Sequence, residues 1–132
     1  MALLDALGAK LATDGVGVVG TSIFLSYMPD SPDSVVVIFE ARGSGPTHTF
    51  GNGVLAVERP AIRVLCRAGR NDYPASRALA LSVRASLGAI RGEVISGVNF
   101  MCVEPSSEPY PVRMDDKERS MFGMDFVAWI NP

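Results

Sequence analysis

The chain has 132 residues, of which 48% are hydrophobic and 20% are charged, and its formal net charge is −2. This length fits one domain with a core of its own, and the composition is that of a folded protein and not of a disordered one. The near-neutral charge argues against a protein whose whole surface binds the phosphate backbone of nucleic acid, although it allows a local basic patch.

The first segment, MALLDALGAKLATDG, predicts a short amphipathic helix that ends at Asp14. Four leucines recur on one helical face, at Leu3, Leu4, Leu7 and Leu11. Asp5 interrupts the apolar part and no basic residue precedes it, so the segment does not have the pattern of a secretion signal. No stretch reaches the roughly twenty apolar residues of a membrane-spanning helix, and we expect no membrane partner.

The next segment, GVGVVG, contains the letters of a dinucleotide-binding fingerprint at Gly15, Gly17 and Gly20. That fingerprint binds pyrophosphate only where it leaves a strand and begins a helix. Here a helix precedes the glycines, and the short apolar run SIFLSYM follows them. We therefore interpret GVGVVG as a connection and expect no cofactor.

The turn PDSPD leads into a segment that is apolar without interruption from Val35 to Phe39. Such a strand has both faces covered, by helices, loops or a neighbouring subunit. Residues 42–57 then predict a long flexible loop that contains His48, the single histidine of the sequence. A lone histidine in a loop provides neither a catalytic triad nor a zinc site, so we expect no catalytic and no metal-binding residues.

Residues 58–68 predict a strand with Ile62, Val64 and Cys66 on one face, and its other face carries Arg59, Arg63 and Arg67. A helix follows at about 74–90, and two further strands are predicted at about 94–103 and 120–130. Both cysteines, Cys66 and Cys102, fall within predicted strands, and we expect reduced thiols.

The predicted order of elements is therefore α-β-β-β-α-β-β. This order indicates an α+β fold. We expect a single domain, residues 1–132, in which two helices pack on an antiparallel or mixed sheet of about four to five strands.

The predicted helix at 74–90 has two faces that differ in character. Its core face is expected to consist of Ala75, Leu79, Val83, Leu87 and Ile90. A second strip of apolar and small side chains lies nearly opposite, and such a strip usually packs against another surface. Arginines seven residues apart project together beside it. We therefore predict a contact between copies of the chain that includes Arg77, Ala78, Leu81, Arg84 and Ala85.

The segment DDKER places three acidic residues, Asp115, Asp116 and Glu118, next to Arg119. Adjacent carboxylates in a turn normally stay solvated, so acid–base catalysis is not indicated. We expect all four residues in the same contact between copies, with the carboxylates as counter-charges for a neighbour's arginines. The alternative basic group is that of the strand at 58–68, either in ion pairs or along a channel: Arg59, Arg63 and Arg67.

Several segments, in their order along the chain, resemble the phage minor capsid and tail-terminator proteins of long-tailed, siphovirus-type phages. They are PDSPDSVVVIFEARG, ERPAIRVLCRAG, DYPASRALALSVRASL and YPVRMDDKERSMFGMDFVAWI, and together they extend over nearly the whole chain. The intervening GSGPTHTFGNGVLAV has no counterpart in this pattern.

This resemblance implies a structural virion protein without catalytic residues, assembled in the host cytoplasm. Proteins of this kind form a ring, usually a homohexamer, at the head-proximal end of the tail. The ring caps the completed tail tube and docks to the head-completion proteins of the connector. Phage DNA passes through its lumen without sequence-specific binding.

Two other classes of function stay open from the residues alone. A small nucleic-acid-binding or regulatory module would use the arginine groups as a phosphate track, although few aromatic residues lie beside them. A small enzyme would need a pocket that joins Glu58, Asp125 or His48, and the sequence shows no convergent set of titrating groups.

Overall fold

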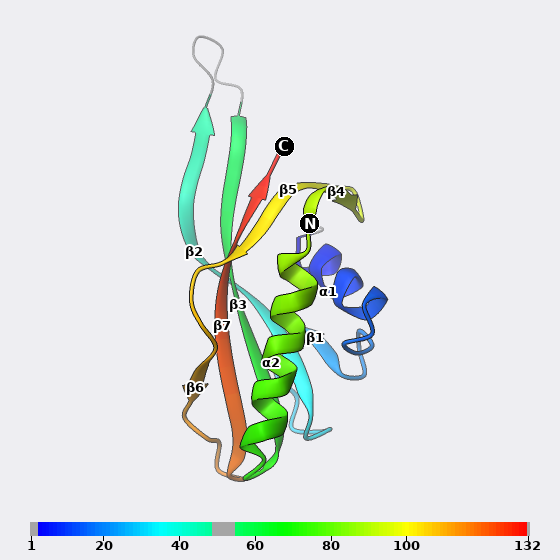
Figure 1. Cartoon of the computed structure of the whole chain (residues 1–132), viewed down its shortest axis with the longest axis vertical. Coiled ribbons are helices and arrows are strands. Elements are labelled where there is room, and N and C mark those ends of the chain that lie inside the picture. The colour runs from blue at the N-terminus through cyan, green and yellow to red at the C-terminus, as the bar shows by residue number, and fades with distance from the viewer. Residues whose placement is uncertain (1–2, 49–54, 132) are drawn as a thin grey trace.

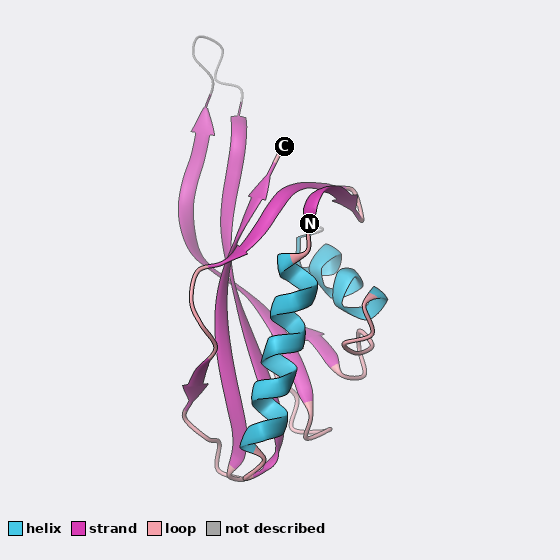
Figure 2. Ribbon diagram, in the orientation of Figure 1, coloured by secondary structure: helices cyan, strands magenta, loops and turns pink. Residues whose placement is uncertain are grey.

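The computed structural model describes residues 3–48 and 55–131. Within these ranges, two helices lie on one face of a seven-stranded sheet (Figure 1, Figure 2). The elements are α1 Leu3–Thr13, β1 Ile23–Leu25, β2 Val35–His48, β3 Leu55–Arg70, α2 Tyr73–Gly88, β4 Arg91–Ile95, β5 Val98–Pro105, β6 Tyr110–Val112 and β7 Arg119–Ile130.

The sheet is mixed, with the strand order β1-β2-β3-β7-β5-β4 and with β6 paired to β7. Its β1–β2 pair is parallel, and the other pairs are antiparallel. β7 is central, because β3 pairs with one edge while β5 and β6 share the other. The predicted α+β class is confirmed.

The sheet has more strands than the four to five predicted, for two reasons. The predicted strand at 94–103 is a hairpin of β4 and β5, because Ser96 and Gly97 have φ values of 49° and 81° and turn the chain between them. Left-handed φ values of this kind are typical of tight hairpin turns. The second reason is β6, a three-residue strand within a segment that has the turn-forming residues of a loop.

The predicted loop at 42–57 is wrong at residues 42–48 and 55–57, which belong to strands, and its residues 49–54 lie outside the described ranges. β2 continues to His48 and β3 begins at Leu55, so the two strands form a hairpin that extends past the rest of the sheet (Figure 1). Register shifts after Ala41 mark bulges in β2. A Cβ atom on Gly43 would lie 2.6 Å from the backbone oxygen of Arg59, so this glycine permits close strand contact and does not mark a loop.

The core lies between the helices and the sheet face beneath them. α1 contributes Leu3, Ala6, Leu7 and Leu11, and β3 contributes Ile62, Val64 and Cys66. Ile62, Val64 and Cys66 occupy every second position of β3 and face the core, as predicted from the alternation of the strand.

The buried face of α2 is rotated from the predicted one. Val83, Leu87 and Ile90 are buried as expected, whereas Leu79 is half-buried and Ala75 is exposed. Ser76 and Ala80 are buried in addition. Ser76 tolerates burial because its hydroxyl contacts the Ser120 hydroxyl at 2.8 Å, which satisfies both polar groups.

The strand segment from Val35 to Phe39 has both faces covered, as predicted. Val36 and Ile38 face the helices, while Val35 and Val37 pack with Phe24 of β1 on the opposite face. The cover on that second face comes from this chain itself, so the apolar strand does not require a neighbouring copy.

Candidate interaction surfaces

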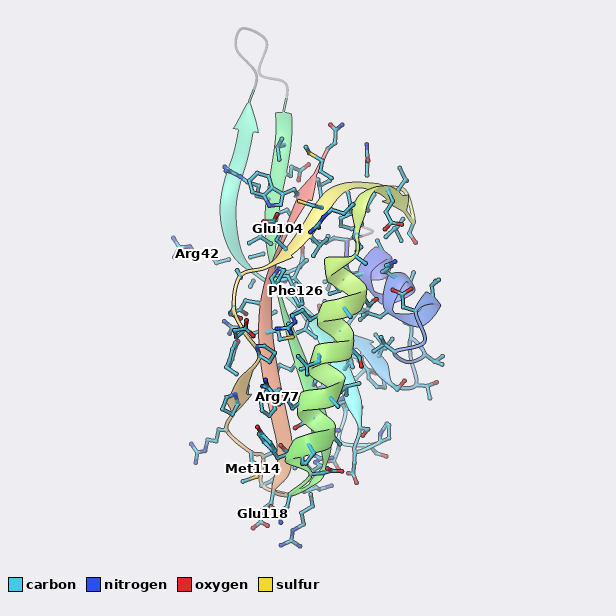
Figure 3. The ribbon with its side chains drawn as sticks, in the orientation of Figure 1. Arg42, Arg77, Glu104, Met114, Glu118 and Phe126 are labelled. Carbon is cyan, nitrogen blue, oxygen red and sulfur yellow. The ribbon has the colours of Figure 1, made fainter. Side chains whose placement is uncertain are left out.

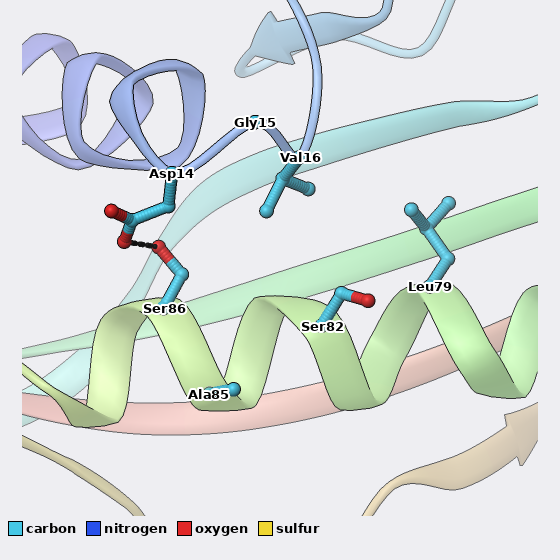
Figure 4. Close-up of a pocket in the computed structure, with 7 residues that line it drawn as sticks. All are labelled: Asp14, Gly15, Val16, Leu79, Ser82, Ala85 and Ser86. Carbon is cyan, nitrogen blue, oxygen red and sulfur yellow. Dashed lines mark hydrogen bonds between the residues drawn. The ribbon is translucent and has the colours of Figure 1, made fainter.

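α2 has a hollow along each of its two flanks. On one flank, two adjoining hollows of about 440 and 360 Å³ share Val16, Leu79 and Ser82. We call them together the helix groove, and Figure 4 shows one part of it, lined by Asp14, Val16, Leu79, Ser82, Ala85 and Ser86. On the other flank lies the basal cleft, a hollow of about 420 Å³ lined chiefly by Tyr73, Val112, Met114, Met121 and Phe122.

One end of the helix groove is fixed by polar contacts between α1 and α2. The Ser86 hydroxyl donates to Asp14 Oδ2 at 2.6 Å, and Lys10 Nζ lies 3.3 Å from the same oxygen (Figure 4). The Ser86 hydrogen bond, with help from Lys10, lowers the pKa of Asp14. Asp14 is therefore an ionised link between the helices rather than a proton donor.

The structure places the predicted helix contact around the outward side of α2. Ala78 and Ala85 line the helix groove, and Leu81 is half-buried outside the core. Arg77 lies toward the other flank, with its Cζ atom 5.9 Å from the Phe122 ring centroid. Arg84 Nη1 is 2.9 Å from Glu108 Oε2, so this arginine already has a counter-charge within the chain.

Two of the three predicted counter-charges also have partners within the chain. Asp115 Oδ2 lies 2.7 Å from Arg119 Nη2, and Glu118 Oε2 lies 2.8 Å from Arg70 Nη2. Asp116 is exposed. The contact between copies stays a prediction for these residues, and in the single chain their first role is to organise the segment before β7.

Arg67 and Arg119 form a buried pair of cations that holds the turn at residues 29–33. Arg67 is only 2% exposed and donates at 2.7–3.4 Å to the backbone oxygens of Pro29, Asp30, Pro32 and Asp33. Arg119 reaches the Asp30 and Asp33 carboxylates at 3.0 and 3.2 Å. Burial lowers the pKa of Arg67, and the Arg119 cation adds to this effect.

This burial corrects the prediction for Arg67 as a channel or ion-pair residue. Its guanidinium donates to backbone carbonyls and is enclosed by its own chain, so it is not available to a lumen or to another copy. The PDSPD turn is the sequence signal that could have suggested that Arg67 binds backbone. Carbonyl groups of such a turn that point toward the protein need hydrogen-bond donors.

The other two arginines of the predicted channel group lie on the sheet face opposite the helices. Arg63 is half-exposed, and its Nε atom donates to Asp125 Oδ1 at 2.9 Å, which raises the pKa of Arg63. Arg59 lies with its Cζ atom 5.6 Å from the Trp129 ring centroid. Both remain candidates for a channel surface.

The residues suggested for an enzyme do not converge. Arg63 of β3 pairs in register with Asp125, whereas Glu58 lies five positions earlier on β3, opposite Ile130. Five residues of a strand extend about 17 Å. The backbone of His48 ends β2 beside Leu55, farther along the projecting hairpin. The part of the chain that the structure describes contains no group of three or more potential metal ligands.

Four of the arginines already have counter-charges within the chain, which weakens the nucleic-acid alternative. Arg63, Arg70, Arg84 and Arg119 each form an ion pair with a carboxylate of the same chain. A continuous phosphate track needs uncompensated cations. The GVGVVG segment connects α1 to β1, and no helix begins after it, so its interpretation as a connection is confirmed.

Both cysteines are free thiols, but their surroundings differ. Burial raises the pKa of Cys66 to about 12. Burial and the Glu104 charge also raise the pKa of Cys102, but Cys102 is only partly buried and a reagent can reach it. Since the thiolate is the nucleophile, we expect a maleimide to modify Cys102 and to spare Cys66 in the native protein. Mass spectrometry should find one label per chain, and two after denaturation. A label on Cys66 in the native protein would contradict this assignment.

Comparison with known proteins decides the family. Residues 10–131 match the bacteriophage tail terminator proteins. The chain belongs to this family. As a tail terminator family member it is a structural protein of a phage-type tail and a component of the virion, and the resemblance seen in the sequence is confirmed.

The fold is shared with a chain from the virion of a native gene transfer agent particle. The two match with a TM-score of 0.64 over 98% of this chain and 95% of that chain, at 16% sequence identity. No curated protein matches the tail terminator chain described here. None of its helices, within the described residues, is long and apolar enough to cross a membrane.

Proposed function

We propose that the chain is a tail terminator that works as a closed ring, most simply a hexamer, at the head-proximal end of the tail. The ring caps the finished tail tube and offers a docking face to the head-completion proteins, and DNA passes through its lumen. The observation that carries this proposal is the family match, which extends over residues 10–131 and leaves no room for a further domain within the chain.

The ring requires one contact repeated around an axis. A head-to-tail contact joins two different surfaces of neighbouring copies. It produces a closed ring when the rotation from one copy to the next is a whole fraction of a full turn. α2 supports such a contact because it has unlike hollows on its two flanks. We place the helix contact, Leu81 with Ala78, Ala85, Arg77 and Arg84, in this surface or at its border. The acidic segment with Asp115, Asp116, Glu118 and Arg119 lies on the same contact.

A lumen for DNA needs a surface on which the duplex slides. Arg59 and Arg63 of the open sheet face are our candidates for that surface. Their charges are moderated by the Trp129 ring and by the Asp125 carboxylate, respectively. Cations that are partly compensated attract phosphate without binding it tightly.

The ring is tested by native mass spectrometry and negative-stain images of the purified chain, alone and with tail tubes. We expect rings, and we expect Leu81→Asp to weaken assembly about tenfold or more, since it places a charge in an apolar contact. Met101→Asp is the control, because Met101 is an exposed apolar residue on the face of β5 opposite the buried Phe100, which packs in the core beneath the helices. A chain that stays monomeric at high concentration and beside tail tubes would contradict the ring. If the Leu81→Asp variant still forms rings, Leu81 lies outside the contact and the ring itself stands.

A further inference from the structure

The GVGVVG connection exposes two adjacent valines at a turn. Val18 and Val19 are 60% and 45% exposed, and no charged residue occurs from Gly15 to Ser22. Single exposed apolar residues are ordinary, but two neighbouring β-branched side chains at the tip of one turn form an apolar projection. We call residues 18–22 the valine turn.

The valine turn is held rigidly by its own hydrogen bonds. The Val18 carbonyl accepts from the N–H groups of Thr21, Ser22 and Ile23 at 3.1, 2.9 and 3.0 Å. The Val18 N–H donates to the Ser22 hydroxyl at 2.9 Å. Because the backbone is fixed and valine has few rotamers, the turn loses little conformational entropy when another surface covers it.

The basal cleft is an apolar hollow that this chain leaves open. Tyr73 and Met114 at its border are about half exposed, and the Tyr73 and Phe122 rings lie 5.4 Å apart. Its volume of about 420 Å³ is in the range of sites that enclose small organic ligands, so two valine side chains fit. Methionine and aromatic side chains at a border adapt well to an apolar partner.

The valine turn and the basal cleft lie on opposite flanks of α2. The cleft lies between α2 and β6, whereas the segment from α1 to β1 borders the other flank (Figure 1). Figure 3 shows Arg77 and Met114 on the cleft flank. Surfaces on opposite sides of one molecule cannot meet within that molecule, but they meet between successive copies in a head-to-tail ring.

The charges beside the two surfaces are complementary. Arg77 and Arg113 at the cleft form no ion pair among residues 3–48 and 55–131, so two cations beside the cleft lack a counter-charge within the chain. On the other flank, Asp14 and Glu93 share one cation, Lys10, at 3.3 and 4.0 Å, so Lys10 can balance the charge of only one of these two carboxylates. Opposite charges around an apolar contact orient the partners and fix their register.

We propose that the valine turn of one copy inserts into the basal cleft of the adjoining copy, with Arg77 and Arg113 facing that neighbour's acidic flank. The partner is thus a second copy of this chain. This inference rests on the proposed ring and names the contact that closes it.

The contact is tested by cross-linking between engineered cysteines. In a Cys102→Ser background, Cys66 is buried and inert, so a short bismaleimide reports only on Val18→Cys and Met114→Cys. The variant with both cysteines should give a ladder of linked species up to the closed ring on a denaturing gel. An equal mixture of the two single variants should give dimers only, because each copy then takes part in one link. Each single variant alone should stay unlinked.

Val18→Glu gives an independent measurement without a cross-linker. A carboxylate in an apolar cleft should raise the dissociation constant of assembly about tenfold or more. Met101→Glu is the control, because Met101 is also an exposed apolar residue, at 47%, but lies on the face of β5 opposite the buried Phe100 and outside both proposed surfaces. Its assembly should change no more than about twofold. Circular dichroism melting checks that both variants fold.

The outcomes separate this contact from the ring itself. Rings in native mass spectra with no linked species, or with unchanged assembly of Val18→Glu, overturn the valine contact and leave the ring intact. Monomers throughout, with no links, overturn both the contact and the ring.

Discussion

Replacing Arg67 by methionine is expected to lower the free energy of unfolding by about 3 kcal/mol. Methionine retains much of the apolar stem but donates no hydrogen bonds. The backbone carbonyls of residues 29–33 that now accept from the guanidinium would lose their donor while partly enclosed. An unsatisfied buried carbonyl costs about 1–3 kcal/mol, so the loss of several exceeds the effect of an ordinary surface change.

The matched control for this substitution is Arg63→Met on the same strand and the same sheet face. Arg63 is half-exposed and forms one ion pair, with Asp125, so its loss should cost no more than about 1 kcal/mol. Urea unfolding at neutral pH measures both variants. Equal losses for the two arginines would show that the contacts of Arg67 with the turn do not stabilise the fold.

Replacing Arg119 by methionine is expected to cost about 2 kcal/mol at neutral pH. Its side chain is 5% exposed and contacts three carboxylates, of Asp30, Asp33 and Asp115. The expected loss is smaller than for Arg67, because two of these carboxylates remain largely in water, and Asp30 keeps Lys117 as a partner. Removal of Arg119 also relieves its repulsion of the Arg67 cation.

The same variant should change the response of the protein to acid. Lys117, and to a smaller extent Arg119, lower the pKa of Asp30. Burial opposes ionisation of Asp115, but hydrogen bonds, chiefly from Arg119, outweigh it and lower the pKa of Asp115. A carboxyl group whose pKa is lower in the folded state stabilises the fold above its unfolded pKa of about 3.9, and this stabilisation is lost as the pH falls through the folded pKa.

We therefore expect the native protein to lose stability as the pH falls below about 4, and Arg119→Met to lose less over the same interval. The reason is that, without Arg119, the folded and unfolded pKa values of Asp115 become more similar. Urea unfolding midpoints at pH 7 and pH 3 measure how much stability each variant loses in acid. Arg63→Met is the control and should lose as much stability between these pH values as the native protein. An acid loss as steep in Arg119→Met as in the native protein would contradict the role of this cation.

Local sequence patterns were sufficient for the parts of the fold whose cause is local. The leucines at helical spacing predicted α1, and the proline near Tyr73 with the apolar period predicted α2. The uninterrupted segment from Val35 to Phe39 predicted a strand with two covered faces. In each case the residues that determine the element lie within it.

The features that sequence reasoning missed depend on contacts between distant segments. Gly43 looks like a loop residue until the Arg59 backbone is placed against it, and β6 forms only because β7 offers a free edge. Arg67 was predicted to serve in ion pairs or along a channel, because strand alternation correctly places it on the face with Arg59 and Arg63. The turn that encloses it lies more than thirty residues earlier in the chain. No periodicity reports such a contact.

The helices of this chain cover only one side of its sheet, and this has a consequence for any assembly of identical copies. If copies are related by rotation about an axis parallel to the strands, every helix layer lies on one wall of the ring and every sheet face without helices lies on the other wall. A single kind of subunit then produces two linings of different chemistry without an additional component. The distinction between inside and outside is already present in each molecule before it meets another.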